Sequence, residues 1–104
     1  MGMFDIKTEK QLVKDIESIG FYYTKAVPHL HYDQYYFERD LDTNGIYTIV
    51  VEYNGESFSL AYGVDYRVSM INKQFELSYD EVLQYLQDFA TTHSIRPIVD
   101  NPNE

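Results

Sequence analysis

The chain has 104 residues, and its 17 Asp and Glu against eight Lys and Arg give a formal net charge of −9. Eleven Tyr and six Phe accompany this acidity, and an apolar fraction of 44% is too high for a disordered segment. The absence of Cys excludes disulfides, a thiolate nucleophile and Cys-ligated metal clusters, and the negative charge argues against direct binding to nucleic acid, whose phosphates would repel it.

The first predicted element is a helix. After Thr8, apolar residues recur at helical spacing with Lys, Asp and Glu on the other side, and Gly20 suits the left-handed position that ends many helices. From Phe21 the period changes to two, and aromatic and β-branched residues predict a strand that Pro28 closes. A second strand is predicted over residues 31–39, followed by a turn at Asn44-Gly45.

The middle of the chain predicts a hairpin. Residues 46–53 form a third strand, and Asn54-Gly55 is a pair typical of the type I′ turns that join antiparallel strands. Strict alternation from residue 58 to residue 70 predicts one long strand, bent at Gly63. Ser78 and Glu81 then form a capping box, and the apolar stripe that follows predicts a second helix over residues 79–93.

These elements predict a two-layer α+β fold. An antiparallel sheet of three to five strands, in the order α-β-β-β(-β)-α, buries its apolar face when both amphipathic helices cover that face. The other face is then open to solvent or to a partner. We expect one domain over residues 1–93 and a polar, mobile C-terminal tail over residues 94–104.

The acidic excess lies in the middle of the sequence, where it is interleaved with Tyr. Residues 28–65 contain seven acids and one base. Tyr combines a large contact area with a hydroxyl group and little rotamer entropy, which suits an interface beside carboxylates. For each single residue, a place in the core, on the exposed sheet or in solvent is the favoured interpretation. The functional hypothesis is that the set forms a partner-binding surface. The predicted residues are Asp33, Tyr35, Tyr36, Glu38, Asp40, Asp42, Tyr47, Glu52, Tyr53 and Glu56.

One group of residues has the spacing of metal ligands. His29, His31 and Asp33 would project from one face of an extended strand, as in some metallohydrolases, but Gln34 stands where the metallo-β-lactamase pattern has a further His. Exposed or hydrogen-bonded histidines beside Pro28 are the favoured interpretation, so no metal is expected. No phosphate-binding loop or nucleophile elbow is present, and we expect neither an enzyme nor a cofactor.

The order helix, three strands, helix also occurs in double-stranded-RNA-binding domains. Those domains carry a Lys cluster at the second helix, where this chain has Ser78-Tyr79-Asp80-Glu81, so that function is rejected. The leading hypothesis is an acidic inhibitor that occupies the basic groove of a nuclease or another nucleic-acid-binding protein, as phage anti-defence and toxin-immunity proteins do. The alternatives are a self-associating accessory protein and, ranked lower, a metalloenzyme using the two histidines.

The setting expected from sequence is the cytoplasm. The chain begins without the basic and apolar regions of a secretory signal, and no apolar run approaches the length that crosses a bilayer. We expect a monomer or homodimer with a basic protein partner, no contact with nucleic acid and no contact with a membrane.

Overall fold

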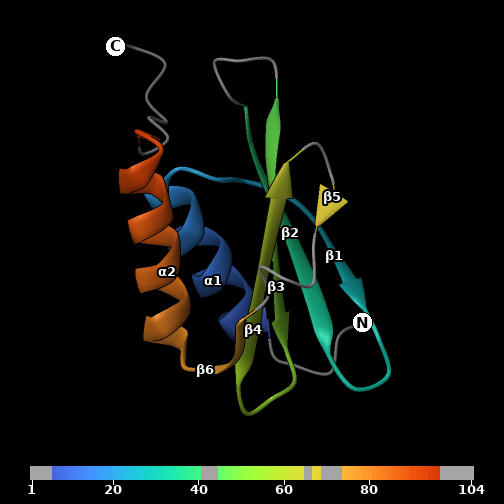
Figure 1. The fold of residues 1–104 in the computed structure, drawn as a ribbon. Coiled ribbons are helices and arrows are strands. Elements are labelled where there is room, and N and C mark those ends of the chain that lie inside the picture. Colours follow the sequence, from blue (N-terminus) through green and yellow to red (C-terminus); the bar gives the residue numbers. More distant parts are fainter. Residues whose placement is uncertain (1–5, 41–44, 65–66, 69–73, 97–104) are drawn as a thin grey trace, which may run out of the picture.

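The computed structural model describes residues 6–40, 45–64, 67–68 and 74–96. Two helices lie side by side on one face of an antiparallel sheet (Figure 1). A helix precedes the strands and another follows them, so the predicted α+β class is confirmed. The elements are α1 (Ile6–Ile19), β1 (Tyr22–Pro28), β2 (Asp33–Asp40), β3 (Ile46–Tyr53), β4 (Phe58–Val64), β5 (Arg67–Val68), β6 (Gln74–Leu77) and α2 (Tyr79–Thr92).

The sheet is built as a meander. Each of the strands β1 to β4 pairs with the next, and the short strands β5 and β6 both pair with β4. The single long strand predicted over residues 58–70 is wrong, because Gly63 pairs with Val68 and Val64 pairs with Arg67, so the chain reverses after β4. A period of two continues across a hairpin, and the pattern therefore could not reveal the reversal.

Both helix ends follow local sequence signals. Gly20 comes directly after α1 with a φ of +136°, and its N–H donates to the Ile16 carbonyl at 3.2 Å. At the start of α2, the Glu81 N–H donates to Ser78 Oγ at 3.1 Å, and the Ser78 N–H donates to Glu81 Oε1 at 2.8 Å. The capping box is confirmed. Neither helix in the described ranges has the length and apolarity of a bilayer-crossing segment.

The hairpin between β3 and β4 is confirmed, but its predicted turn type is wrong. Tyr53 pairs with Phe58, and the Asn54 N–H donates to the Ser57 carbonyl at 3.3 Å. A type I′ turn at Asn54-Gly55 needs a positive φ at both of these residues. Gly55 has a φ of +96°, but neither Asn54 nor Glu56 has a positive φ. The Asn54 side chain instead accepts hydrogen bonds from the N–H groups of Glu56 and Ser57, each at 2.9 Å. Asn54 therefore stabilises the loop as its first residue and not as one of the two central residues of the turn.

The main core lies between the helices and one face of the sheet. Its largest completely enclosed side chains come from both helices, from β2, β3 and β4, and from the residue before β1. They are Leu12, Ile16, Phe21, Tyr35, Phe37, Ile49, Val51, Leu60, Val82 and Leu86. The opposite face is not uniformly open, contrary to expectation. Thr48, Val50 and Ala61 lie on it by register and are nevertheless buried.

The first residues of the expected C-terminal tail pack against the domain. The Ile95 N–H donates to the Ala90 carbonyl at 2.8 Å, and the Ile95 side chain contacts the core. Arg39 Nη1 donates to the carbonyls of Gly20 at 2.9 Å and Arg96 at 3.0 Å, which joins the end of α1 to this segment. Residues 97–104 lie outside the described residues.

Candidate functional site

The structure divides the predicted acidic and aromatic set between two faces of the sheet. Residues that pair directly across strands share a face, and Tyr35, paired with Val51, belongs to the face that the helices cover. By the same register Asp33, Tyr47 and Tyr53 lie on this inner face, whereas Tyr36, Glu38, Asp40 and Glu52 lie on the outer face. Glu56 lies in the β3–β4 loop, and Asp42 is outside the described residues. The ten residues therefore do not form one surface.

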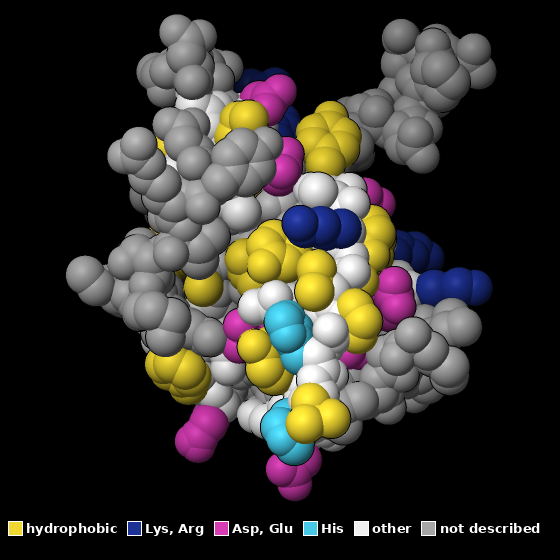
Figure 2. Space-filling view, turned by 90° about the vertical axis from the view of Figure 1, so that its right-hand side faces the viewer, with side chains coloured by type: hydrophobic (Ala, Val, Ile, Leu, Met, Phe, Trp, Pro, Cys, Tyr) yellow, Lys and Arg dark blue, Asp and Glu magenta, His cyan; other side chains and the backbone are white. Residues whose placement is uncertain are grey.

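Members of the set on the outer face already contact their neighbours. Gln34 Nε2 donates to Glu52 Oε2 at 2.9 Å, and the Tyr36 hydroxyl donates to Gln34 Oε1 at 3.2 Å. The Lys25 ammonium lies 4.9 Å from the centre of the Tyr36 ring, where it places a positive charge on the same face. Figure 2 shows hydrophobic, His and basic side chains in the middle of this view and acidic side chains spread around it.

On the inner face, two of the predicted residues are buried. Asp33 is 4% exposed and Tyr35 is 2% exposed, so neither side chain is accessible to a partner. Burial raises the pKa of the Tyr35 hydroxyl well above its ordinary value of 10, and the neighbouring Asp33 raises it further. Asp33 Oδ1 has no hydrogen-bond partner. These two residues therefore belong to the interior of the domain.

The two histidines lie around the β1–β2 connection and not on an extended strand. The last pair of that hairpin is Pro28 with Asp33, and the His29 N–H donates to the Tyr32 carbonyl at 2.8 Å. The His29 ring stacks on Tyr32 with centroids 4.5 Å apart, and its Nε2 lies 2.8 Å from Gln34 Oε1. His31 is exposed, whereas Asp33 is buried on the inner face. The ranges that the structure describes contain no group of three His, Cys, Asp or Glu side chains arranged to hold a metal ion.

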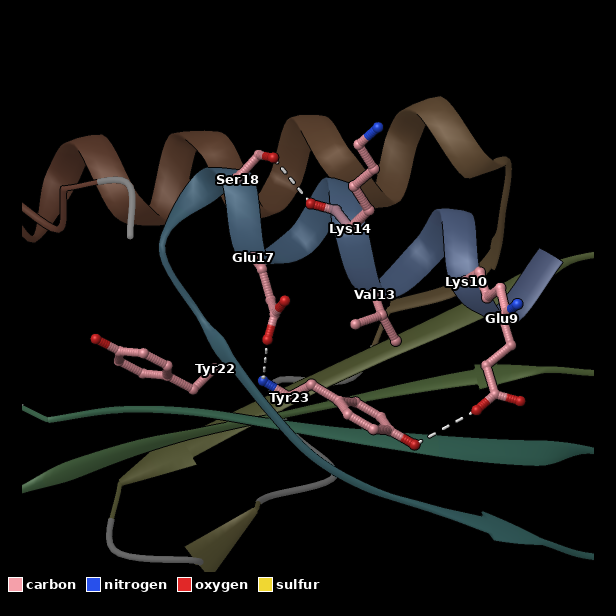
Figure 3. A pocket seen from close by; sticks show the side chains of 8 residues that line it. All are labelled: Glu9, Lys10, Val13, Lys14, Glu17, Ser18, Tyr22 and Tyr23. Carbon is pink, nitrogen blue, oxygen red and sulfur yellow. Dashed lines mark hydrogen bonds between the residues drawn. The ribbon is translucent and has the colours of Figure 1, made fainter. Parts of the chain in front are cut away.

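A groove of about 680 Å³ lies between α1 and the edge strand β1 (Figure 3). Two carboxylates of α1 cross it to the same residue of β1. Glu17 Oε2 accepts the Tyr23 N–H at 3.2 Å, and Glu9 Oε2 lies 3.5 Å from the Tyr23 hydroxyl, whose pKa is raised by burial and by Glu9. Lys10 and Lys14 also line the groove, so it carries both charges. The Tyr23 N–H at this edge already donates to Glu17, and β1 has a bulge between Tyr23 and Lys25. The edge is therefore poorly suited to pair with a further strand.

Acidic residues with no Lys or Arg between them in the sequence lie instead on α2 and the strand before it, both toward α1, where Asp80 lines a groove, and toward β4, where Asp88 lines a pocket. Residues 74–95 contain Glu76, Asp80, Glu81 and Asp88 and no Lys or Arg, and all four acidic residues are exposed. Two large aromatic residues of the same segment are also exposed, Phe75 by 58% and Tyr85 by 45%. We call these six residues the α2 acidic surface. None of these six residues was among the predicted binding residues, although the run of 22 residues without a Lys or Arg was the available signal.

A smaller pocket of about 260 Å³ opens between α2 and β4. The buried Leu60 and Leu86 are among its lining residues, as is Tyr62 from β4. The other described lining residues come from α2 or directly follow it, namely Tyr85, Asp88, Phe89, Thr92 and His93. Tyr85 and Asp88 belong to the α2 acidic surface as well, so the pocket is continuous with that surface.

Comparison with protein-family models, with curated proteins and with solved structures found no match to this chain.

Proposed function

We propose that this protein is an acidic binding module that attaches to a basic protein through the α2 acidic surface. The observation that carries the proposal is the joint exposure of four carboxylates with Phe75 and Tyr85 on a segment that has no Lys or Arg. Charged residues bring partners together, whereas exposed aromatic residues supply contact area at low entropic cost. The two together are typical of a protein-binding surface.

The partner class follows from charge. A net charge of −9 repels nucleic acid and steers the protein toward a strongly basic surface. Grooves that hold phosphates are lined by Lys and Arg, so a nucleic-acid-processing protein is the partner class we propose, and occupation of its groove by α2 inhibits it. Association by this route is fast at low ionic strength and weakens as salt screens the charges.

The experiment compares two charge-reversal pairs. Glu76→Lys with Asp80→Lys changes the α2 acidic surface while leaving the Ser78–Glu81 capping box intact, and Asp40→Lys with Glu56→Lys makes the same charge change on exposed residues elsewhere. Each protein is immobilised, exposed to native cell extract at low and high salt, and the retained proteins are identified by mass spectrometry. Circular dichroism verifies folding.

The proposal requires a basic nucleic-acid-processing protein that is retained by the native chain and by the Asp40/Glu56 pair, released by salt, and lost from the Glu76/Asp80 pair. Equal retention by both pairs, or retention that ignores salt, refutes it. Recovery of the chain alone, with a mass by light scattering that rises with concentration, favours the self-associating alternative instead.

A further inference from the structure

The pocket between α2 and β4 has a lining that is unusual in its chemistry. Four rings line it: Tyr62 from β4, and Tyr85, Phe89 and His93 from α2 and its C-cap. Phe89 joins them, because its ring centroid lies 4.9 Å from that of Tyr62 in a T-shaped contact and 4.2 Å from that of His93 in a stacked contact. Among the described residues of the lining, Asp88 is the one carboxylate, and none is Lys or Arg.

Such a lining favours a cation. The faces of Tyr and Phe rings carry negative electrostatic potential, and a guanidinium or ammonium group within about 6 Å of a ring centroid is attracted to them. The Asp88 carboxylate adds a formal charge at the exposed end of the pocket, while Leu60 and Leu86 give it an apolar base. An anion would meet both Asp88 and the ring faces unfavourably. Asp88 Oδ1 accepts a hydrogen bond from Gln84 Nε2 at 2.9 Å, and a carboxylate can accept further N–H groups, so a guanidinium adds a charge-assisted contact that a neutral apolar group cannot make.

The volume of the pocket also limits the size of the group that can occupy it. A volume of about 260 Å³ is below the range of pockets for drug-sized ligands and suits one long side chain. The planar guanidinium of Arg can stack on an aromatic face and pair with a carboxylate through two N–H groups, which an ammonium group cannot do. Arg is therefore the cationic side chain that this combination of rings and one carboxylate suits best.

We propose that the α2–β4 pocket binds the guanidinium end of an arginine side chain presented by the partner protein. This inference rests on the proposed function, because it specifies how a basic partner is anchored once the α2 acidic surface has attracted it. The ring faces of Tyr62 and Tyr85 hold the guanidinium plane beside Phe89, whose own ring stacks on His93, and Asp88 accepts the guanidinium N–H groups.

The test uses the isolated protein and small probes. N-acetyl-arginine amide is titrated into the isotopically labelled protein while the ring signals of Tyr62, Tyr85 and Phe89 are followed by NMR. N-acetyl-citrulline amide is the matched control, since it has nearly the same shape without the charge. N-acetyl-lysine amide separates recognition of guanidinium from recognition of any cation.

We expect arginine amide to bind at least about ten times more tightly than citrulline amide, with the largest shifts at those three rings. Asp88→Asn and Tyr85→Ala should each weaken arginine binding by about two- to fivefold. Gln87→Ala, on the same helix but outside the pocket lining, should leave binding unchanged.

Three outcomes overturn the inference: equal binding of arginine and citrulline amides, equal binding of lysine and arginine amides, or shifts that lie at Glu76 and Asp80 and not at the pocket rings. Each is distinct from failure of the proposed function, because Asp88 and Tyr85 are untouched in the Glu76/Asp80 charge-reversal pair. A partner lost from that pair but retained by Tyr85→Ala would preserve the binding module and exclude the arginine pocket.

Discussion

Replacement of Gly20 by Ala should destabilise the domain more than any other single-methyl addition in the described turns. Gly20 has a φ of +136°, a conformation that side chains with a Cβ rarely adopt, and such backbone strain costs about 1–3 kcal/mol. An added Cβ would also lie 2.6 Å from the Arg96 carbonyl oxygen and 2.8 Å from Ile95 Cγ2. Backbone and side chain of residues 95–96 must therefore move.

That movement removes further interactions. Arg39 Nη1 cannot hold both the Gly20 and Arg96 carbonyls if they separate, and a lost hydrogen bond of this kind costs about 1 kcal/mol. Ile95 would lose part of its packing against the core. We expect a total loss of about 2–4 kcal/mol in the free energy of unfolding, which is about 10–20 °C in the melting temperature for a domain of this size.

The assay is urea denaturation followed by circular dichroism, with two comparisons. Gly55→Ala places a Cβ at a φ of +96° in an exposed loop, so it reports backbone strain without the crowding. Ile95→Ala removes the Cγ2 atom, so Gly20→Ala should cost less in that background. A loss at Gly20 below about 0.5 kcal/mol, a loss equal to that at Gly55, or strict additivity with Ile95→Ala would refute the explanation.

Three further changes test other parts of the fold. Ser78→Ala breaks the capping box with Glu81 and should cost about 1 kcal/mol, whereas Ser78→Asp should be close to neutral by thermal denaturation. Leu86→Ala removes a buried side chain and should cost about 2–5 kcal/mol in urea, and a loss under 1 kcal/mol would contradict its place in the core. Burial raises the pKa of both Tyr35 and Tyr79 above 10, and a hydrogen bond to Asp15 raises that of Tyr79 further. Above pH 10 the folded state therefore keeps protons that the unfolded state releases. Stability should be at its full value below pH 10 and fall above it, and Tyr35→Phe with Tyr79→Phe should flatten this decline in urea midpoints measured from pH 8 to 11.5.

Local signals in the sequence determined the ends of the elements. The Ser78–Glu81 box begins α2 because both of its hydrogen bonds join residues three apart, and Gly20 comes directly after α1 because the chain needs a positive φ there. The class of the fold was equally accessible, since two helical stripes and one alternating sheet have few ways to bury their apolar sides together. These features depend on neighbours in sequence or on periodicity alone.

Tertiary structure decided which residues meet. Alternation places Tyr35 and Tyr36 on opposite faces of a strand, but only the position of the helices determines that Tyr35 is buried and Tyr36 remains partly accessible. The reversal after Val64 also depended on pairing, because a hairpin preserves the period of two.

In the candidate site, too, composition and tertiary packing determined different features. Tyr62 on β4 and Phe89 on α2 are 27 positions apart in the sequence, and their 4.9 Å ring contact exists because α2 packs across β4. The composition of the chain therefore determined that the protein is acidic and rich in aromatic rings. Packing determined where carboxylates and rings share a surface, since contacts between distant segments form only when the layers come together.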